Sequence, residues 1–397
     1  MSASQSQSSV TLVNLRIWDG QQARSEDALQ IEGSRIRQIA HSSELKESEA
    51  PARTRIDCTG LTAIPGLIDA HVHLELNPDE KDPPERTEPS VLPLMAERAA
   101  QMARQGITTA RDLGGGAWHE LALRDAIAAG EQPGPRLLCS GQPITSPGGH
   151  CHFWGGEAAD LAAAHTVLQR QVDHGVDLIK IMATGGRMTR GSEPTDAQFS
   201  LDVLKAVVTT AHQHQLPVAA HCHGTEGIHR AALAGVDTIE HCSWVGREGW
   251  ASDYQEDVAQ VILDNGVWVS PTVNRGWQRM LDSKTGAVLK RVRTAYQRML
   301  EIGIPLVAST DAGIPGVYHA DLPHALVVFA RIALLSPSAA LKSATSDAAR
   351  ALRIDHITGT LAAGKDADIL VLDGDPLDDL QAVTRPVQVY CRGRRAR

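Results

Sequence analysis

The sequence predicts an α/β protein in which a (β/α)8 TIM barrel is inserted in a small composite β-sandwich domain. Between residues 63 and 353, short apolar segments rich in β-branched residues alternate with stretches of helical periodicity. This alternation is typical of a parallel sheet with helical crossovers. Both ends of the chain carry only short β-like segments. We therefore expect residues 1–62 and 354–397 to build the small domain, and residues 63–353 to build the barrel.

The barrel prediction rests on eight strand-like segments with helix-like stretches between them. The predicted strands are 63–69, 107–112, 136–141, 177–184, 217–223, 237–242, 267–272 and 305–311. The helix-like stretches include 91–105, 158–174, 201–214, 251–265 and 287–302. Eight such repeats at this spacing indicate a barrel of ordinary size.

The small domain is predicted from β-like segments at the two ends of the chain. They are VTLVNLRIW (10–18), ALQIEG (28–33), RIRQIA (35–40), ADILVLDG (367–374) and VQVYCRG (387–393). Turn residues such as Asp19-Gly20 separate the first three, which favours a small antiparallel sheet. We expect the C-terminal tail to join this sheet.

Composition and charge exclude several classes of protein. The 397 residues are 42% hydrophobic and 21% charged, and the net charge of −9 argues against a nucleic-acid or anionic membrane surface. No apolar run approaches the ~18 residues of a membrane-spanning helix. The N-terminal MSASQSQSS lacks the pattern of a signal peptide. We expect a cytoplasmic protein whose six cysteines are reduced.

Metal-ligand residue types stand at the ends of several predicted strands. His71 and His73 end the first barrel strand, and residues two apart in a strand point to the same side. A His-x-His pair alone is a weak signal, because core or surface histidines are commoner. However, His221 ends the fifth strand, His241 the sixth and Asp311 the eighth. Barrel enzymes carry their active sites at this face, so the sequence predicts a shared metal centre there.

Lys180 is the least expected residue of the sequence, because it lies within an apolar strand segment, IKIMAT. An unpaired buried lysine costs several kcal/mol or loses its charge. Reaction with carbon dioxide would turn its amine into a carbamate, whose two oxygens can each bind one of two metal ions. A salt bridge, or a side chain that points outward to solvent, is the alternative.

Motifs along nearly the whole chain resemble those of the amidohydrolase superfamily, in its imidazolonepropionase-like, prolidase-type branch. They are PGLIDAHVHL (65–74), IKIMATGG (179–186), AAHCHGTEGI (219–228), DTIEHCS (237–243), STDAG (309–313) and GTLAAGKDADILVLDGDP (359–376). The resemblance implies a barrel with a small β-sandwich, a two-metal centre and hydrolysis. It also implies zinc as the usual metal, although manganese or iron stays open.

The resemblance further implies a role for each ligand-type residue. His71, His73 and Asp311 would hold one divalent ion, His221 and His241 the second, and carboxylated Lys180 would bridge them. The expected reaction is hydrolysis of an amide-type C–N bond in a small molecule. Candidate substrates are a dipeptide such as Xaa-Pro, an N-acyl amino acid, or a carbamate or urea-like compound. Asp311 would act as general base and then as general acid.

Substrate contacts are expected in the loops. In the loop SPGGHCHFWGGEA (146–158), His150 or His152 is expected to donate a hydrogen bond to the substrate, with a plain polar loop as the alternative. His223 shares a strand face with His221 and is a candidate oxyanion or supporting group.

Three further residues complete the expected substrate site. Arg187 or Arg190 would clamp a substrate carboxylate, unless both are solvated charges, and Tyr318 would form a pocket wall.

Two other functions stay open at this stage. The first is a mononuclear deaminase or cyclic-amide hydrolase, as in imidazolonepropionase. Deaminase-type relatives carry a glutamate three residues after the strand-5 histidine, where this chain has Gly224, and Glu226 follows two residues later. The second is a non-catalytic protein of the same fold, which would be expected to have lost ligands. The resemblance also suggests a homo-oligomer.

Overall fold

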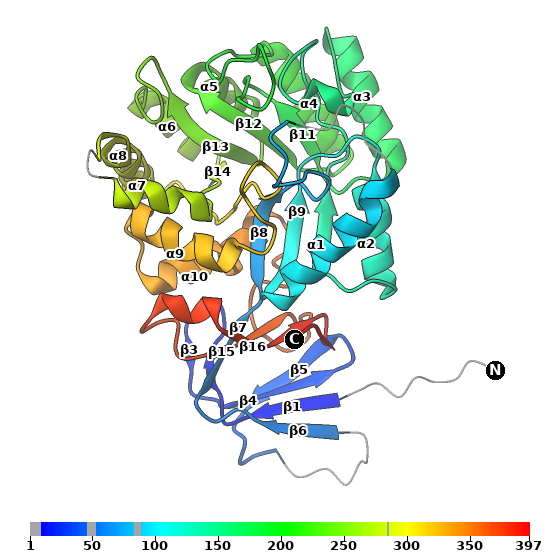
Figure 1. Ribbon diagram of the computed structural model, residues 1–397, viewed down its shortest axis with the longest axis vertical. Coiled ribbons are helices and arrows are strands. Elements are labelled where there is room, and N and C mark those ends of the chain that lie inside the picture. The colour runs from blue at the N-terminus through cyan, green and yellow to red at the C-terminus, as the bar shows by residue number, and fades with distance from the viewer. Residues whose placement is uncertain (1–8, 46–52, 83–88, 284–285) are drawn as a thin grey trace, which may run out of the picture.

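The computed structural model describes residues 9–45, 53–82, 89–283 and 286–397 (Figure 1). Figure 1 shows a ring of strands surrounded by helices, and beneath it a smaller body of strands to which both ends of the chain contribute. This arrangement is the α/β architecture expected from the sequence, a barrel accompanied by a small β domain.

Within the described residues the barrel contains seven regular strands, and every ladder between two of them is parallel. They are β8 (Leu67–Val72), β9 (Ile107–Asp112), β10 (Arg136–Cys139), β11 (Ile179–Met182), β12 (Val218–Gly224), β13 (Thr238–Val245) and β14 (Trp268–Ser270). The segment after β10 connects to β11 through Ile144: its N–H donates to the Lys180 carbonyl (2.9 Å) and its carbonyl accepts from the N–H of Met182 (2.8 Å).

The eighth predicted strand, 305–311, occupies its expected place but is not a continuous strand. Single parallel bridges connect Leu306 to β14 and Ala312 to β8. Between these bridges, the N–H of Ala308 donates to the carbonyl of Ser343 and the N–H of Thr310 donates to the carboxylate of Asp69. The backbone donors therefore leave the ladder, and the prediction of a regular strand was wrong here.

The first predicted barrel strand, 63–69, is two strands. β7 (Leu61–Pro65) pairs with strands of the small body, and only β8 belongs to the barrel. Gly66 lies at the junction, where its N–H donates to the carbonyl of Asp368 (2.9 Å). A Cβ atom at this position would lie 2.2 Å from the Thr108 side chain, so the close approach of β8 to β9 requires glycine.

We expect Gly66→Ala to destabilise the protein by about 1–3 kcal/mol, because the added methyl group overpacks the junction. Urea unfolding of the purified protein measures this change. Thr108→Gly removes the side-chain atoms in the way and should restore part of the loss in the double variant. Equal destabilisation with and without Thr108→Gly would contradict this explanation.

Helices cover the outside of the barrel, because their apolar residues recur every three or four positions. The longer ones are α1 (Leu92–Arg104), α2 (His119–Ala129), α3 (Leu161–His174), α4 (Leu201–Gln213), α5 (Thr225–Ala234), α6 (Glu256–Asp264), α8 (Ala287–Ile302) and α9 (Leu322–Ala333). Shorter ones are α7 (Gln278–Asp282), α10 (Pro337–Ser343) and α11 (Ser346–Ala351). The side chains of Asp160 and Ser200 cap α3 and α4.

Two sheets form the small body. The order β5-β4-β1-β6 uses β5 (Arg35–Ala40), β4 (Ala28–Glu32), β1 (Ser9–Val13) and β6 (Arg53–Asp57). The order β17-β16-β15-β7-β2-β3 adds β17 (Arg394–Arg395), β16 (Pro386–Cys391), β15 (Ile369–Asp373), β2 (Arg16–Trp18) and β3 (Ala23–Arg24). The predicted strand 10–18 is thus two strands in different sheets, because Asn14 turns the chain with φ 59°.

Both ends of the chain meet in this body. β15 from the C-terminal tail pairs with β7, and apolar side chains of Leu12, Leu29 and Val371 pack in a shared core between the sheets. The domain boundaries at residues 62 and 353 stay predictions.

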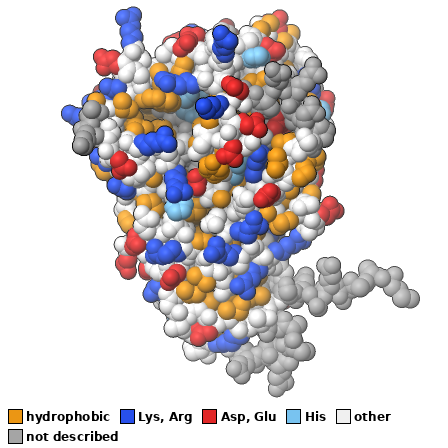
Figure 2. Space-filling model, in the orientation of Figure 1, with side chains coloured by type: hydrophobic (Ala, Val, Ile, Leu, Met, Phe, Trp, Pro, Cys, Tyr) orange, Lys and Arg blue, Asp and Glu red, His pale blue; other side chains and the backbone are white. Residues whose placement is uncertain are grey.

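The surface carries mixed charges, and the cysteines lie inside the protein. On the face drawn in Figure 2, basic and acidic side chains are interspersed and form no single large patch of either sign. All six cysteines are buried and unpaired. Among the described residues, no helix combines the length and apolarity that crossing a membrane requires.

Candidate metal centre

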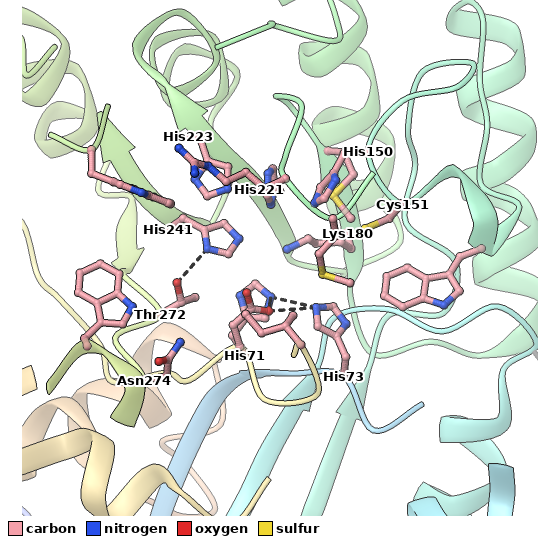
Figure 3. A pocket seen from close by; sticks show the side chains of 18 residues that line it. His71, His73, His150, Cys151, Lys180, His221, His223, His241, Thr272 and Asn274 are labelled. Carbon is pink, nitrogen blue, oxygen red and sulfur yellow. Dashed lines mark hydrogen bonds and ion pairs between the residues drawn. The ribbon is translucent and has the colours of Figure 1, made fainter. Parts of the chain in front are cut away.

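Predicted ligands from β8 and from the segment after residue 305 meet in one pocket (Figure 3). The Nε2 atoms of His71 and His73 lie 3.3 Å apart. The Oδ1 atom of Asp311 lies 3.3 Å from Nε2 of His71 and 3.4 Å from Nε2 of His73. The three side chains therefore converge on one point, as neighbouring strand ends allow.

The histidines of β12 and β13 line the same pocket. The ring centroids of His221 and His241 are 4.5 Å apart, and that of His241 is 5.2 Å from His71. The Nδ1 atom of His241 lies 2.8 Å from the hydroxyl of Thr272. Ligand atoms of His71, His241 and Asp311 all lie within 4.8 Å of one another, so the two sets of predicted ligands form one cluster.

His223 lies closer to the cluster than a supporting role requires. Its ligand atom is within 4.8 Å of those of His221 and His241, so these three side chains could also hold one ion. Its Nδ1 atom lies 3.0 Å from the hydroxyl of Ser243, and the His223 side chain lines the pocket. His223 could therefore be a metal ligand, and its predicted role as an oxyanion or supporting group stays a prediction.

Lys180 projects from β11 into the pocket beside these histidines (Figure 3). It is only 1% exposed, and its Nζ atom has no hydrogen-bond partner among the residues that the structure describes. Burial lowers the pKa of this ammonium group, so the neutral amine becomes accessible. An unpartnered buried amine among imidazole and carboxylate donors fits the predicted metal-bridging carbamate and not the alternative of a salt bridge.

The protonation states of the cluster suit metal binding. Burial lowers the pKa of His71 to about 4 and that of His223 to about 3, so both imidazoles are neutral near pH 7. Burial raises the pKa of Asp311, but the neighbouring His71 and His73 outweigh it and hold the pKa below its usual value. Neutral imidazoles and an ionised carboxylate are the forms that coordinate metals.

A buried ion pair orients His71, and the sequence reasoning missed it. The Nδ1 atom of His71 lies 3.0 Å from Oε2 of Glu240, and Arg111 donates to Oε1 of the same carboxylate (2.7 Å). Burial raises the pKa of Glu240, but Arg111 and His71 lower it further, and the carboxylate is ionised. It therefore holds a proton on Nδ1 and leaves Nε2 free toward the pocket. A carboxylate inside the apolar strand DTIEHC was the signal.

We expect Glu240→Gln to weaken metal binding by about 10–100-fold, because the neutral amide no longer fixes the tautomer of His71 and leaves Arg111 without its counter-charge. Titration of the metal-free protein against a competing chelator measures the affinity. Glu256→Gln, at the exposed start of α6, is the matched control. Unchanged affinity in Glu240→Gln would mean that His71 is oriented without the carboxylate.

Of the predicted substrate contacts, the structure brings two to the pocket. His150 lines it with its ring centroid 4.5 Å from that of His221, and burial lowers the pKa of His150 to about 3. Arg187 also lines the pocket, with its guanidinium 5.5 Å above the ring of Trp250.

Three other predicted contacts lie outside the pocket lining. They are His152, Arg190 and Tyr318. Tyr318 is 47% exposed because its hydroxyl donates to the carboxylate of Asp79 (2.6 Å) and turns the ring away. In the loop before η2 (His152–Trp154), the side chain of His150 lines the pocket, whereas that of His152 does not. The alternation of side chains that holds in a strand does not hold in these loops.

A parallel barrel with histidine, lysine and aspartate side chains gathered at the C-terminal ends of its strands defines a class of protein. It is a barrel enzyme whose catalytic face carries a cluster of metal-ligand side chains.

The chain belongs to the Amidohydrolase family, whose family model matches residues 62–396. It is 27% identical to Ochratoxinase of Aspergillus niger over 357 residues, which covers 82% of this chain and 73% of that protein. A crystal structure of a Xaa-Pro dipeptidase with bound methionine has a TM-score of 0.84 and 26% identity, covering 98% of this chain and 99% of the other. A prolidase complexed with N-methylphosphonate-L-proline has a TM-score of 0.83 and 26% identity, covering 98% and 99%.

These comparisons confirm the resemblance to the amidohydrolase superfamily. The chain is a hydrolytic enzyme, and its family and structural neighbours support a hydrolase of amide-type C–N bonds that acts on small molecules. The prediction of a non-catalytic protein is therefore set aside.

Proposed function

We propose that the protein is a binuclear metal-dependent hydrolase in which carboxylated Lys180 bridges two divalent ions. The buried, unpartnered Nζ atom of Lys180 carries this proposal. In the carboxylation step, the neutral amine attacks carbon dioxide, a C–N bond forms and one proton leaves the nitrogen. The product is an anion with two ligand oxygens, which suits a pocket that otherwise contributes mostly neutral imidazoles.

The candidate ligands are divided between the two ions according to the strands that carry them. His71, His73 and Asp311 would hold one ion, and His221 and His241 the other. Zinc accepts this combination of nitrogen and carboxylate ligands. When bound, the two ions lower the pKa of a water molecule toward ~7 and polarise the substrate carbonyl.

Asp311 is the residue that moves the proton in this proposal. Its carboxylate is ionised near pH 7 and lies at the meeting point of His71 and His73. It would accept the proton of the attacking water and return it to the leaving nitrogen, since a positioned carboxylate can serve as base and then as acid. His150 and His223 face the pocket and are placed to donate a hydrogen bond to the substrate carbonyl.

The substrate would be an amide such as a dipeptide, an N-acyl amino acid, or a carbamate or urea-like compound. Similarity to a Xaa-Pro dipeptidase and to Ochratoxinase supports this range. Arg187 has no hydrogen bond or ion pair within the described part of the chain and is placed to bind a substrate carboxylate.

A mononuclear hydrolase or deaminase is the second candidate. The grouping of His221, His223 and His241 favours it, because three histidines suffice for one catalytic ion. Against the deaminase form, Glu226 lies on α5 with its side chain 55% exposed and paired with Arg230. No glutamate therefore stands in the proton-transfer position expected of that class.

Metal reconstitution separates the two candidates. The protein is stripped with a chelator, reloaded with zinc with or without bicarbonate, and assayed for ions per chain by mass spectrometry and for amide hydrolysis. We expect about two ions per chain and a second ion that depends on bicarbonate. One ion per chain, with activity independent of bicarbonate, would favour the mononuclear enzyme. A homo-oligomer and a cytoplasmic location stay predictions.

A further inference from the structure

Tryptophan is concentrated around the metal centre. The chain has seven tryptophans, and Trp154, Trp250 and Trp277 line the pocket. They come from three different loops, after β10, β13 and β14. Only 4% of the residues are aromatic, so three tryptophans at one site indicate a binding surface for a flat group.

The tryptophans divide into one fixed ring and two accessible ones. Trp154 is 2% exposed, its indole N–H donates to Oε1 of Glu75 (3.0 Å), and its ring packs 5.1 Å from that of His73. Trp250 and Trp277 are half-buried, with ring centroids 6.4 Å apart at 62°. Trp154 therefore supports a ligand residue, whereas the other two present their surfaces to the pocket.

Trp250, one of the accessible tryptophans, lies between the histidine cluster and the positive charge of Arg187. The ring of Trp250 lies 5.1 Å from that of His223 and carries the guanidinium of Arg187 above it. Among the residues that line the pocket, Asp311 is the only carboxylate, and His71 and His73 surround it. The charge of Arg187 is therefore available to an incoming anion.

We propose that Arg187, Trp250 and Trp277 form a subsite for an aromatic α-amino acid that is the amine half of the substrate. This inference rests on the proposed function. The carboxylate of the amino acid would pair with the guanidinium of Arg187, and its ring would pack against Trp250 and Trp277. The amide carbonyl would then lie beside His223, next to the metal ligands.

A second, apolar part of the pocket lining suits the acyl half. It contributes Trp154, Met188 and Ile314, which have apolar side chains and no free charge. The two parts of the lining thus differ in chemistry, and the difference would orient the substrate. Preferred substrates are N-acyl derivatives of phenylalanine, tyrosine or tryptophan, including dipeptides that end in one of these residues.

Steady-state kinetics of the zinc-loaded protein test the subsite. N-acetylphenylalanine is compared with N-acetylalanine, which lacks the ring, and with N-acetylphenylalanine amide, which lacks the carboxylate. We expect kcat/KM for N-acetylphenylalanine to exceed both by about 10–100-fold, as for the loss of a charged hydrogen bond or a buried ring.

Two variants separate the contributions. Arg187→Gln should lower kcat/KM for the acid and leave the amide analogue almost unchanged, whereas Trp250→Leu should remove the preference for phenylalanine over alanine. Arg247→Gln, an exposed arginine in the loop that carries Trp250, is the matched control and should change neither ratio. Calorimetric binding of the product phenylalanine gives a second readout, which Arg187→Gln should weaken by a similar factor.

The outcomes distinguish this inference from the proposed function. Hydrolysis of all three compounds at equal kcat/KM, or unchanged preferences in both variants, would overturn the subsite and leave the hydrolase standing. Failure of the zinc-loaded protein to hydrolyse any of the three compounds would overturn the subsite, and failure on dipeptides, carbamates and urea-like compounds as well would overturn the proposed function.

Discussion

Lys180→Met is expected to abolish turnover and, at the same time, to stabilise the metal-free protein. The amine is buried without a partner. Replacing it with an apolar side chain of similar length removes an unsatisfied buried donor, a gain of about 1–3 kcal/mol. The same change removes the bridging carbamate, so the second ion should be lost and activity should fall at least as far as the ~10²–10⁴-fold expected for losing one catalytic group.

Thermal unfolding of the stripped protein and ions per chain after reloading measure the two effects. Lys205→Met, on the exposed face of α4, is the matched control and should retain two ions and normal turnover. A variant that is more stable without metal but binds fewer ions identifies Lys180 as a functional residue. A Lys180→Met protein that still binds two ions and turns over normally would eliminate the carbamate.

Asp311→Asn is expected to lower kcat by about 10²–10⁴-fold while the fold is retained, because an amide cannot accept the proton of the attacking water. Asparagine is the suitable replacement for a structural reason as well. Asp311 has φ 61°, a left-handed conformation that asparagine tolerates better than other residues. Its backbone N–H donates to the carbonyl of His71 (2.9 Å), and this contact survives the change.

Measurement of kcat, ions per chain and the unfolding midpoint in the same preparation distinguishes proton transfer from ligation. Loss of kcat with at least one ion retained supports the proton-transfer role. Loss of both ions would make Asp311 a ligand only, and near-normal kcat would exclude the role altogether. Asp264→Asn, on the exposed side of α6, controls for the general effect of losing one carboxylate.

Backbone strain at the site accompanies these roles. His241, Thr272 and Asp311 all have positive φ, and Thr272 is a β-branched residue for which this conformation is a genuine outlier. Such conformations cost about 1–3 kcal/mol each. Thr272 follows the end of β14 and Asp311 follows the segment 305–310, whereas His241 lies within β13, where the Thr272 hydroxyl contacts it. The strained backbone at these residues therefore lowers the stability of the fold at the positions that orient the candidate ligands.

Local pattern predicted most of the fold. The predicted helices 201–214 and 287–302 match α4 and α8 closely. Their signals are local: the apolar spacing lies within each helix, and the capping residue Ser200 directly precedes α4. The predicted strand 10–18 failed because its alternation continues past Asn14, so the pattern does not reveal that the chain changes sheet. The segment 305–311 failed because the N–H groups of Ala308 and Thr310 donate to the carbonyl of Ser343 and to the Asp69 carboxylate and not to a neighbouring strand.

The candidate ligands could be predicted because strand ends of a parallel barrel meet at one face. Sequence alone did not identify the ion pair of Arg111 and Glu240, since it forms only when β9 and β13 face each other across the barrel interior. It also did not separate His150 from His152, or Arg187 from Arg190. Those choices depend on loop conformations that no periodicity describes.

The sequence by itself determined the alternation of strands and helices and the residue types at the strand ends, because both depend on residues close together in the chain. Only the tertiary structure decided which loop side chains reach the pocket, and it alone showed that the amine of Lys180 has no partner and that Trp250 carries the charge of Arg187. These contacts join residues far apart in sequence. The packing of the whole barrel sets the distances between these residues, and the secondary-structure preferences of short segments do not.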